Sequence, residues 1–324
     1  MSKKPGTDHD VGMTLITSST RPVRLRAADP AQLVALLPYL FGFPPDESVI
    51  VLALSDNRVQ AAARLDVTAA DDPAALSARL AAVTAHGPYC VVIGWSADAA
   101  RAEQAAQAVA AALGRAAQII VVSGGRCRAG QGPWQPCPTT VPAAEQAGLT
   151  VLPSRAALAA QVAGPDSGDE AAAARWQAAC ADAAGRSLEW RRRRALALLR
   201  HGLDDPDAMT LPEKAEMAAL VRDGAVRDAL WPKLTRRKAH RQLAWWQAVV
   251  GAVPDEGAPA PLGWLAMAAW LDGQGALQSC CLERGLAIAP QHSLLRLAES
   301  INLLGLHPDA WARLRRSFPV AAPG

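Results

Sequence analysis

The chain has 324 residues, enough for about two domains, and 51% of them are hydrophobic, so it can bury a sizeable core. It carries 33 basic and 30 acidic side chains, and this near balance excludes a disordered polyelectrolyte. Alanine recurs throughout the chain, which favours helices over strands.

The start of the chain and its apolar stretches give no sign of export or of a membrane span. Residues 1–20 begin polar and lack the apolar core of a secretory signal, and the stretches 33–43 and 262–271 are shorter than the roughly 20 residues that cross a bilayer. The six cysteines form no C-x-x-C pair, so we expect a reducing cytoplasm, no metal site and no cofactor. The cysteines are Cys90, Cys127, Cys137, Cys180, Cys280 and Cys281.

The first half alternates strands with helices. A helix capped by Asp29 is expected to end at Gly42, and the strands 48–54 and 58–66 form a β-hairpin. The later elements expected here are helix 73–86, strand 89–94, helix 98–113 capped by Ser96, and strand 118–122, before an irregular, proline-rich stretch. This pattern predicts a three-layer α/β domain whose sheet is mostly parallel or mixed and contains the antiparallel hairpin.

The second half is expected to be an all-α domain that holds eight of the ten tryptophans. Its predicted helices include one from Thr210 to Trp231 and three late ones, 262–271, 276–288 and 294–304. The sequence thus divides into an α/β domain, a linker, a helical domain and two flexible termini. Their expected bounds are 21–162 for the α/β domain, 163–170 for the linker, 171–318 for the helical domain, and 1–20 and 319–324 for the termini.

Polar side chains are expected to gather where three strands of the sheet end and one begins. Strands 58–66, 89–94 and 118–122 run parallel if right-handed helical crossovers join them, and the antiparallel strand 48–54 then starts at their carboxyl ends, where open α/β sheets bind ligands. The candidate ligand-binding residues there are Asp46, Glu47, Ser48, Asp66, Ser96, Asp98, Ser123, Gly124, Gly125 and Arg126. Arg126 favours an anion and Asp46 and Glu47 oppose it, so a small polar or zwitterionic ligand is expected in one cleft.

The same residues allow a purely structural interpretation and two weaker chemical ones. Ser96 and Asp98 can simply cap a helix, and Gly124-Gly125 can simply turn the chain, because this pair lacks a phosphate-loop spacing. Residues 94–98 (GWSAD) carry only the first half of a nucleophile elbow, and His86 is the sole nearby base for Ser48, Ser96 or Ser123. No catalytic residue can be assigned.

The excess positive charge lies in residues 186–241, which hold 14 basic and 8 acidic side chains. Four consecutive arginines, Arg191 to Arg194, fan around a helix and cannot form one stripe along a phosphate backbone, so they are interpreted as solvated, and Arg191 and Arg192 would lay their stems over the core. Nucleic-acid binding is therefore a minor alternative. The tryptophans expected on apolar helical faces are Trp190, Trp231, Trp246, Trp264 and Trp270.

The sequence also carries two resemblances to known families. Residues 36–52 (LLPYLFGFPPDESVIVL), 125–126, 152–155 and 226–229 resemble an actinobacterial domain-of-unknown-function family, DUF 4192, which implies no activity, cofactor or catalytic residue. Members of that family often carry a Cys-Cys-Pro after the Gly-Arg pair, whereas this chain keeps only residues 136–138 (PCP). The positions of Leu265, Gly273, Leu282, Gly285 and Pro290 are similar to one tetratricopeptide helix pair, with departures at Ala266 and Gln278.

These observations favour a non-catalytic binding or adaptor protein of the cytoplasm. Its α/β domain would hold the small ligand, and its helical domain would dock a protein partner. One alternative is a hydrolase or transferase that works at the same sheet edge, and the other is a nucleic-acid-binding protein that uses residues 186–241.

Overall fold

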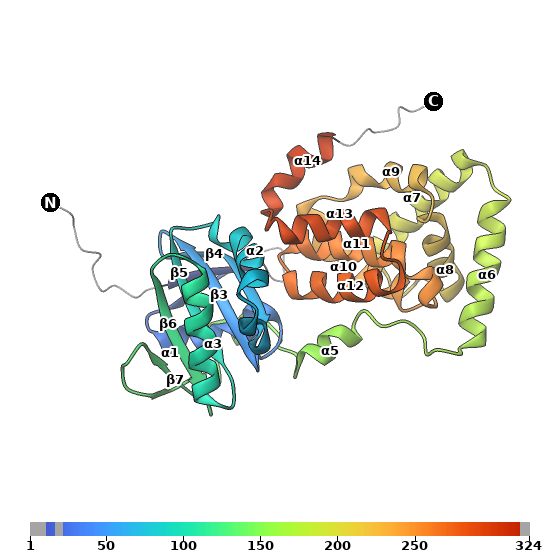
Figure 1. Ribbon diagram of the computed structural model, residues 1–324. Helices are drawn as coiled ribbons and strands as arrows, with labels where there is room; N and C mark the ends of the chain where they lie inside the picture. The colour runs from blue at the N-terminus through green and yellow to red at the C-terminus, as the bar shows by residue number, and fades with distance from the viewer. Residues whose placement is uncertain (1–10, 17–21, 318–324) are drawn as a thin grey trace. The chain divides into compact units, whose positions relative to one another are not determined.

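The computed structural model describes residues 11–16 and 22–317, and the chain divides into two compact units between Arg155 and Ala156 (Figure 1). Most of the predicted flexible termini, residues 1–10, 17–20 and 318–324, lie outside the described residues. Residues 11–16, which were expected in the N-terminal tail, form strand β1 (Val11–Ile16). The predicted linker, 163–170, lies within the second unit: residues 163–169 are loop, and Glu170 begins the next helix.

The first unit is built on one mixed eight-stranded sheet with the order β2-β1-β4-β3-β5-β6-β7-β8. The hairpin strand β3 lies between β4 and β5 and is antiparallel to both, β5 and β6 are parallel, and β1 is parallel to β4. The strands other than β1 are β2 (Pro22–Ala27), β3 (Ser48–Ser55), β4 (Arg58–Asp66), β5 (Tyr89–Trp95), β6 (Ala117–Ser123), β7 (Arg126–Ala129) and β8 (Gln135–Pro136). The three predicted strand directions and the α/β fold class are confirmed.

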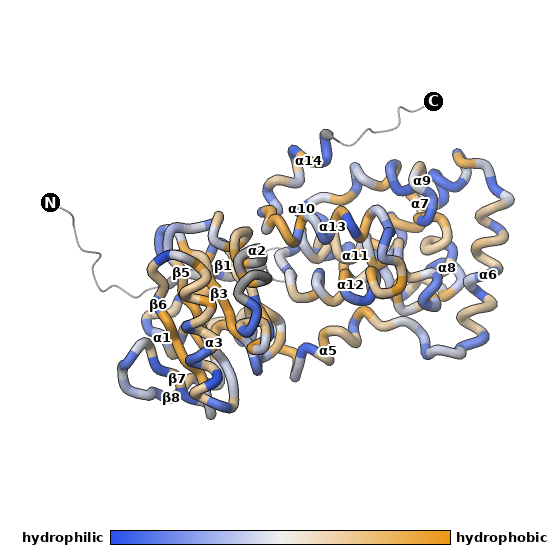
Figure 2. Tube along the Cα trace, viewed as in Figure 1, coloured by the Kyte–Doolittle hydropathy of each residue, from blue (hydrophilic) through white to orange (hydrophobic). Residues whose placement is uncertain are grey.

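Helices cover both faces of this sheet, which makes three layers. Helix α1 (Pro30–Phe41) packs on one face over Ile50, Leu52 and Ile93. Helices α2 (Pro73–Thr84) and α3 (Ala99–Ala112) pack on the other face over apolar side chains that alternate with the first set. Because β3 is covered on both faces, its first seven residues are all buried, and Figure 2 shows the apolar residues along the central strands.

Local sequence signals set the ends of these helices. The Asp29 carboxylate accepts a hydrogen bond from the Gln32 backbone N–H, and Gly42 ends α1 with φ of 81°. Helix α3 is capped by Asp98 and not by the predicted Ser96. The Asp98 carboxylate reaches two N–H groups of the first turn, while the Ser96 hydroxyl accepts from the Asp98 N–H in the loop before it.

The stretch after β6 is more regular than its prolines suggest. Strands β7 and β8 extend the sheet there, followed by the short helix α4 (Pro142–Gln146). Gly124 and Gly125 both have positive φ, 55° and 72°, and form the two-residue turn between β6 and β7. Proline is compatible with this arrangement because β8 is the edge strand and need not donate on its outer side.

The second unit is helical, as predicted for this part of the chain. The predicted helix from Thr210 to Trp231 is two helices, because the chain turns at residues 221–223 and Asp223 caps a new helix. The helices are α5 (Arg155–Ala160), whose first residue precedes the boundary, α6 (Glu170–Ala184), α7 (Leu188–Asp204), α8 (Leu211–Leu220), α9 (Gly224–Leu230), α10 (Arg236–Val250), α11 (Pro259–Asp272), α12 (Gly275–Ile288), α13 (Ser293–Leu303) and α14 (Trp311–Ser317).

Helix α11 is the centre of this unit, because every residue from Ala260 to Asp272 is buried and α10, α12 and α13 pack against it (Figure 1). The Trp264 ring stacks on Trp246 at 5.4 Å and lies 4.9 Å from Trp231. Four of the five tryptophans predicted for apolar faces are buried; Trp190 is partly exposed, with the Arg186 guanidinium over its ring. The tetratricopeptide-like positions fall on α11, α12 and the residues that follow each, and that resemblance stays a prediction.

Within the described part of the chain, every helix is too short or too polar to cross a bilayer.

Candidate functional site

The strand register brings the predicted site residues to one edge of the sheet. Ser48 at the start of β3 pairs with Asp66 at the end of β4 and with Trp95 at the end of β5, and Trp95 pairs with Val122 near the end of β6. We call this row and the loops that follow it the carboxyl edge. Pro44, Pro45 and Asp46 come before the edge in the chain. The loop Ser96–Asp98 follows β5 there, and the turn at Gly124-Gly125 follows β6.

Glu47 is the centre of a hydrogen-bond network at the carboxyl edge. Its carboxylate accepts from the Ser96 hydroxyl at 2.9 and 3.0 Å and from the Ala97 backbone N–H at 2.9 Å. The Glu47 backbone has φ of 43°, and its carbonyl accepts from the Val67 N–H at 3.0 Å, so the loop joins β3, β4 and β5. The residue has left-handed backbone geometry, which costs a non-glycine residue about 1 kcal/mol and which the network offsets.

Two other acidic residues at this edge cap helices. The Asp66 carboxylate accepts from the Thr68 hydroxyl at 2.8 Å and the Thr68 N–H at 3.1 Å, and these hydrogen bonds hold the Asp66 pKa below its ordinary value. Asp98 caps α3 as described above. Each carboxylate therefore has a structural task, but each side chain is exposed to solvent on its outer side.

The β6–β7 turn is held to the loop after β5. The Ser123 hydroxyl donates to the Ala97 carbonyl at 2.8 Å, and the Ser96 N–H donates to the Val122 carbonyl at 3.2 Å. Arg126 pairs with Ser123 across the turn, and its Nη2 donates to the Trp134 carbonyl at 3.1 Å, so the guanidinium keeps further donors for other acceptors.

Ser48 is the most deeply buried of the candidate residues, and Ser96 is also buried. Its side chain is fully buried and its hydroxyl donates to the Asp46 carbonyl at 2.7 Å. By strand alternation Ser48 shares the α1 face with Ile50 and Leu52, whereas Ser123 lies on the α3 face. Chain direction places both residues at the same edge, but their side chains occupy opposite faces of the sheet, so they do not line the same cleft.

The exposed charges of the carboxyl edge are mostly negative. Asp46, Glu47, Asp66 and Asp98 are exposed there with Arg126. Two further guanidinium groups near this edge already have partners. That of Arg64 packs over the Phe43 ring at 5.5 Å and donates to the Asp46 carbonyl, and that of Arg101 pairs with the Asp71 carboxylate at 2.7 Å. Such an arrangement can bind an ammonium group among the carboxylates and a carboxylate at Arg126.

The predicted base lies elsewhere. His86 follows α2, next to Gly87, whose Cα faces the Leu54 backbone at the end of β3 opposite to Ser48. His86 is thus at the opposite edge of the sheet from the serines, and it is the one histidine of the first unit that the structure describes. No described histidine of this unit is positioned to activate Ser96 or Ser123.

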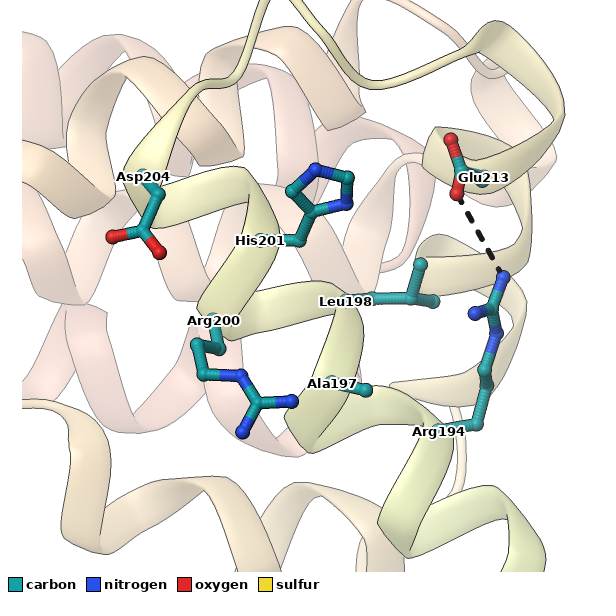
Figure 3. Close-up of a pocket in the computed structure, with 7 residues that line it drawn as sticks. All are labelled: Arg194, Ala197, Leu198, Arg200, His201, Asp204 and Glu213. Atoms are coloured by element: carbon teal, nitrogen blue, oxygen red, sulfur yellow. Dashed lines mark ion pairs between the residues drawn. The ribbon is translucent and has the colours of Figure 1, made fainter.

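The second unit contains a polar pocket that the sequence pattern did not predict. It has a volume of about 290 Å³ and lies along α7, with one wall from α8 (Figure 3). Its lining residues are Arg194, Ala197, Leu198, Arg200, His201, Asp204 and Glu213. The spacing Arg194, Ala197, Leu198, His201 follows one helical face and could have indicated it, but the facing Glu213 comes from a separate helix.

The arginine run mostly ties helices together instead of facing solvent. Arg191 pairs with Asp223 at 2.5 Å, Arg192 donates to the Ala225 carbonyl at 3.2 Å, and Arg194 binds both oxygens of the Glu216 carboxylate at 2.7 and 2.8 Å. Arg193 alone fits the solvated interpretation, since its side chain is 70% exposed. Asp223 and Glu216 therefore neutralise the charges of Arg191 and Arg194, which are then less available to a phosphate backbone.

Soft and hard metal ligands do not gather in the described residues: no group of three or more His, Cys, Asp or Glu side chains could hold an ion there. All six cysteines are free thiols. Cys280 and Cys281 are buried in α12, where they pack as small apolar groups.

Comparison with known proteins gives one match. The sequence model of a family described as Domain of unknown function (DUF4192) matches residues 30–309, which covers both units. No curated protein and no solved structure matches the chain.

Proposed function

We propose that this chain, which belongs to the family of unknown function DUF4192, is a non-catalytic binding protein of the cytoplasm. Its first unit would hold a small zwitterion at the carboxyl edge, and its second unit would dock a protein partner. The cysteines are scattered along the chain and form no C-x-x-C pair, which is typical of a protein of a reducing compartment.

The observation that carries the proposal is that the serine hydroxyl groups at the carboxyl edge are hydrogen-bonded within the fold. Ser48, Ser96 and Ser123 each donate their hydrogen to a neighbouring acceptor of the fold, and the described histidine of this unit lies at the other edge. A hydroxyl nucleophile needs a base within hydrogen-bond reach, about 2.6–3.2 Å. Of these serines, Ser96 has such a base in the Glu47 carboxylate at 2.9 Å, but the Ser96 side chain is buried and only 3% exposed to a substrate. The geometry therefore supports binding over hydrolysis or group transfer, which stay the alternative.

The charges at the edge indicate the chemical class of the ligand. Four exposed carboxylates surround the loops, and Arg126 adds donors beside the turn at Gly124-Gly125. An anion alone would be repelled by these carboxylates, and a cation alone would leave Arg126 unused. A small molecule with one ammonium group and one carboxylate, such as an amino acid, satisfies both.

The partner-docking part of the proposal is supported by the end of α13. Leu294, Leu295, Ala298 and Ile301 of this helix are buried, whereas Leu303 and Leu304 are 60% and 64% exposed. Exposed large apolar side chains next to one another are a feature of interaction surfaces. Changing both leucines to serine should leave the unit folded and abolish the interaction with the partner.

The test of the ligand site is a thermal-shift screen of the full chain against zwitterionic amino acids, simple carboxylates and simple amines. We expect at least one amino acid to raise the Tm of the wild type by roughly 4 °C at a hundredfold excess over its Kd, because a ligand of the folded state stabilises it. Carboxylates and amines that carry a single charge should shift the Tm less.

Matched variants locate the site. Arg126→Ala should abolish the shift, and Arg58→Ala, which removes an exposed arginine from the opposite edge of the same sheet, should keep it. Equal responses of the two variants, or no response to any zwitterion, would contradict the proposal. Product formation from a bound compound would favour the enzymatic alternative.

A further inference from the structure

We propose that Cys127 and Cys137 are a dithiol site that low-molecular-weight disulfides oxidise to an internal disulfide. This proposal is independent of the ligand site, because it concerns the α1 face of the sheet. It rests on the position of the two thiols on neighbouring strands and on their contact with each other.

The strand register brings the two cysteines together. In the β7–β8 pair, Cys127 is opposite Gln135 and Arg126 is opposite Pro136. The Cys137 N–H donates to the Gly125 carbonyl at 2.9 Å, which continues this pairing by one residue. Cys127 and Cys137 are therefore diagonal neighbours on one face of the hairpin.

Both side chains point into the same layer. Cys127 is completely buried in the cluster beneath α1, and Cys137 packs against that cluster while keeping part of its surface in solvent. On this shared face the Cys137 thiol donates a hydrogen bond to the Cys127 sulfur. Cys280 and Cys281, the other neighbouring cysteines, differ because they are consecutive residues of one helix and both are buried.

The contact also separates the acidities of the two thiols. The hydrogen bond from Cys137 lowers the pKa of Cys127, with a smaller contribution from Gln135 that acts against burial. The same hydrogen bond raises the pKa of Cys137, together with burial. Cys127 thus holds the thiolate of the pair, and Cys137 holds the proton and the solvent-exposed surface.

The reaction balances with a glutathione-type disulfide as the oxidant. The Cys137 sulfur passes its proton to Cys127, attacks one sulfur of the oxidised disulfide and expels one glutathione thiolate, which leaves a mixed disulfide at Cys137. The Cys127 sulfur then attacks the Cys137 sulfur and expels the second thiolate. Two cysteine sulfurs are oxidised and one disulfide is reduced to two glutathione sulfurs. The single proton that the pair held ends on one glutathione thiolate, and the other glutathione thiolate takes its proton from water.

The test is oxidation of the full chain in glutathione buffers of increasing oxidised fraction, followed by alkylation, tryptic digestion and mass spectrometry. Trypsin cleaves after Arg126 and Arg128, so the linked form carries the dipeptide Cys127-Arg128 on the peptide 129–155. We expect this linked peptide to replace both alkylated peptides. We also expect oxidation to raise the Tm by roughly 5 °C, since the disulfide restricts the conformations of the unfolded chain.

Two variants make the outcome decisive. Cys137→Ser should lose the linked peptide and the shift of the Tm, and Cys180→Ser, which removes a partly exposed thiol of the second unit, should keep both. If Cys137→Ser does not fold, Cys137→Ala replaces it. A stable glutathione adduct on Cys137 without the linked peptide, or a wild type that keeps both thiols while Cys180 reacts, would overturn the proposal.

Discussion

The carboxyl edge of the first unit and helix α7 of the second unit use their charged side chains in different ways. In the first unit, Asp66 and Asp98 at the carboxyl edge accept hydrogen bonds from residues two positions further along the chain. Glu47 instead accepts one from Ala97 in the loop after β5. In the second unit, arginines of α7 pair with acidic residues of α8 and α9. The sheet edge therefore keeps charged groups in solvent where a ligand can reach them, whereas the helical bundle uses its charges to fix the packing of helices.

The largest expected loss of stability comes from glycine substitutions that disrupt the packing of one unit at a time. A methyl group at Gly94 of β5 would lie 2.0 Å from the Ala102 carbonyl oxygen of α3, and one at Gly202 of α7 would lie 2.3 Å from the Trp245 ring. Either substitution by alanine should lower the free energy of unfolding by about 3 kcal/mol, because neither site has room for the methyl group.

Urea unfolding read by tryptophan fluorescence and far-UV circular dichroism checks this effect. Gly202→Ala should move the fluorescence transition, since most tryptophans belong to the second unit. The control is Gly275→Ala, because no atom lies within 4 Å of the added methyl group there and the change should leave stability equal or higher. A wild-type midpoint in Gly94→Ala would show that β5 and α3 are not packed as described.

The second effect removes the network at the carboxyl edge. Glu47→Ala should lower the free energy of unfolding by about 2 kcal/mol, since the buried Ser96 hydroxyl and the Ala97 N–H both lose their acceptor. Asp46→Ala is the matched control, because no hydrogen bond of the Asp46 side chain is described and the change should cost less than about 0.5 kcal/mol. Equal losses of stability would contradict the role given to Glu47.

The third expected effect is the contribution of the arginine ion pairs of the second unit to its stability. A double-mutant cycle with Arg194→Met and Glu216→Gln should give a coupling energy of about 1 kcal/mol, because the pair is bidentate and its Glu216 side chain is only 18% exposed. The same cycle on Arg193 and Glu189, which are 70% and 77% exposed, should give less than about 0.5 kcal/mol. A larger coupling energy for Arg193 and Glu189 than for Arg194 and Glu216 would contradict this account.

The smallest effect is a difference in pH dependence between the units. The hydrogen bonds from Thr68 lower the Asp66 pKa below 3.8, so this group adds stability above that pH and loses it as the pH falls through the folded value. Burial raises the Asp272 pKa above 3.8, against hydrogen bonds from Gln274 and His240, so this group favours the folded state at low pH and less so as the pH rises.

Two variants test these two opposite pH dependences of stability separately. Thr68→Val should reduce the loss of stability of the first unit on acidification, because the Asp66 pKa then moves back toward its ordinary value. Asp272→Asn should gain stability relative to the wild type as the pH rises from about 3 to 6, since asparagine does not titrate. Chemical denaturation at a series of pH values measures both, and parallel profiles for variant and wild type would contradict the assignments.

The sequence could predict the fold where the signal is local or directional. Strand directions and the meeting of Ser48 with Asp66 and with the end of the third strand at one edge follow from a hairpin and two crossovers, and both are found. Chain direction does not give the face of the sheet on which a side chain lies, so the sequence does not reveal that Ser48 and Ser123 lie on opposite faces.

What could not be predicted depends on partners far along the chain. The Glu47 contact with Ser96 crosses 49 positions, and the pairing of Arg194 with Glu216 joins separate helices whose rotation about their axes no periodicity gives. Strand β8 escapes prediction because two residues with a proline carry no strand pattern, and its existence depends on the neighbouring β7. For the same reason the spacing of Cys127 and Cys137 does not reveal their contact.

The central claim is that the carboxyl edge binds a zwitterion without changing it. The most direct measurement is isothermal titration of the full chain with the amino acid that gives the largest thermal shift, followed by proton NMR of the recovered ligand after prolonged incubation. The account predicts one site per chain in the wild type and in Arg58→Ala, none in Arg126→Ala, and an unchanged NMR spectrum. Binding that survives Arg126→Ala, or a ligand converted to another compound, would contradict it.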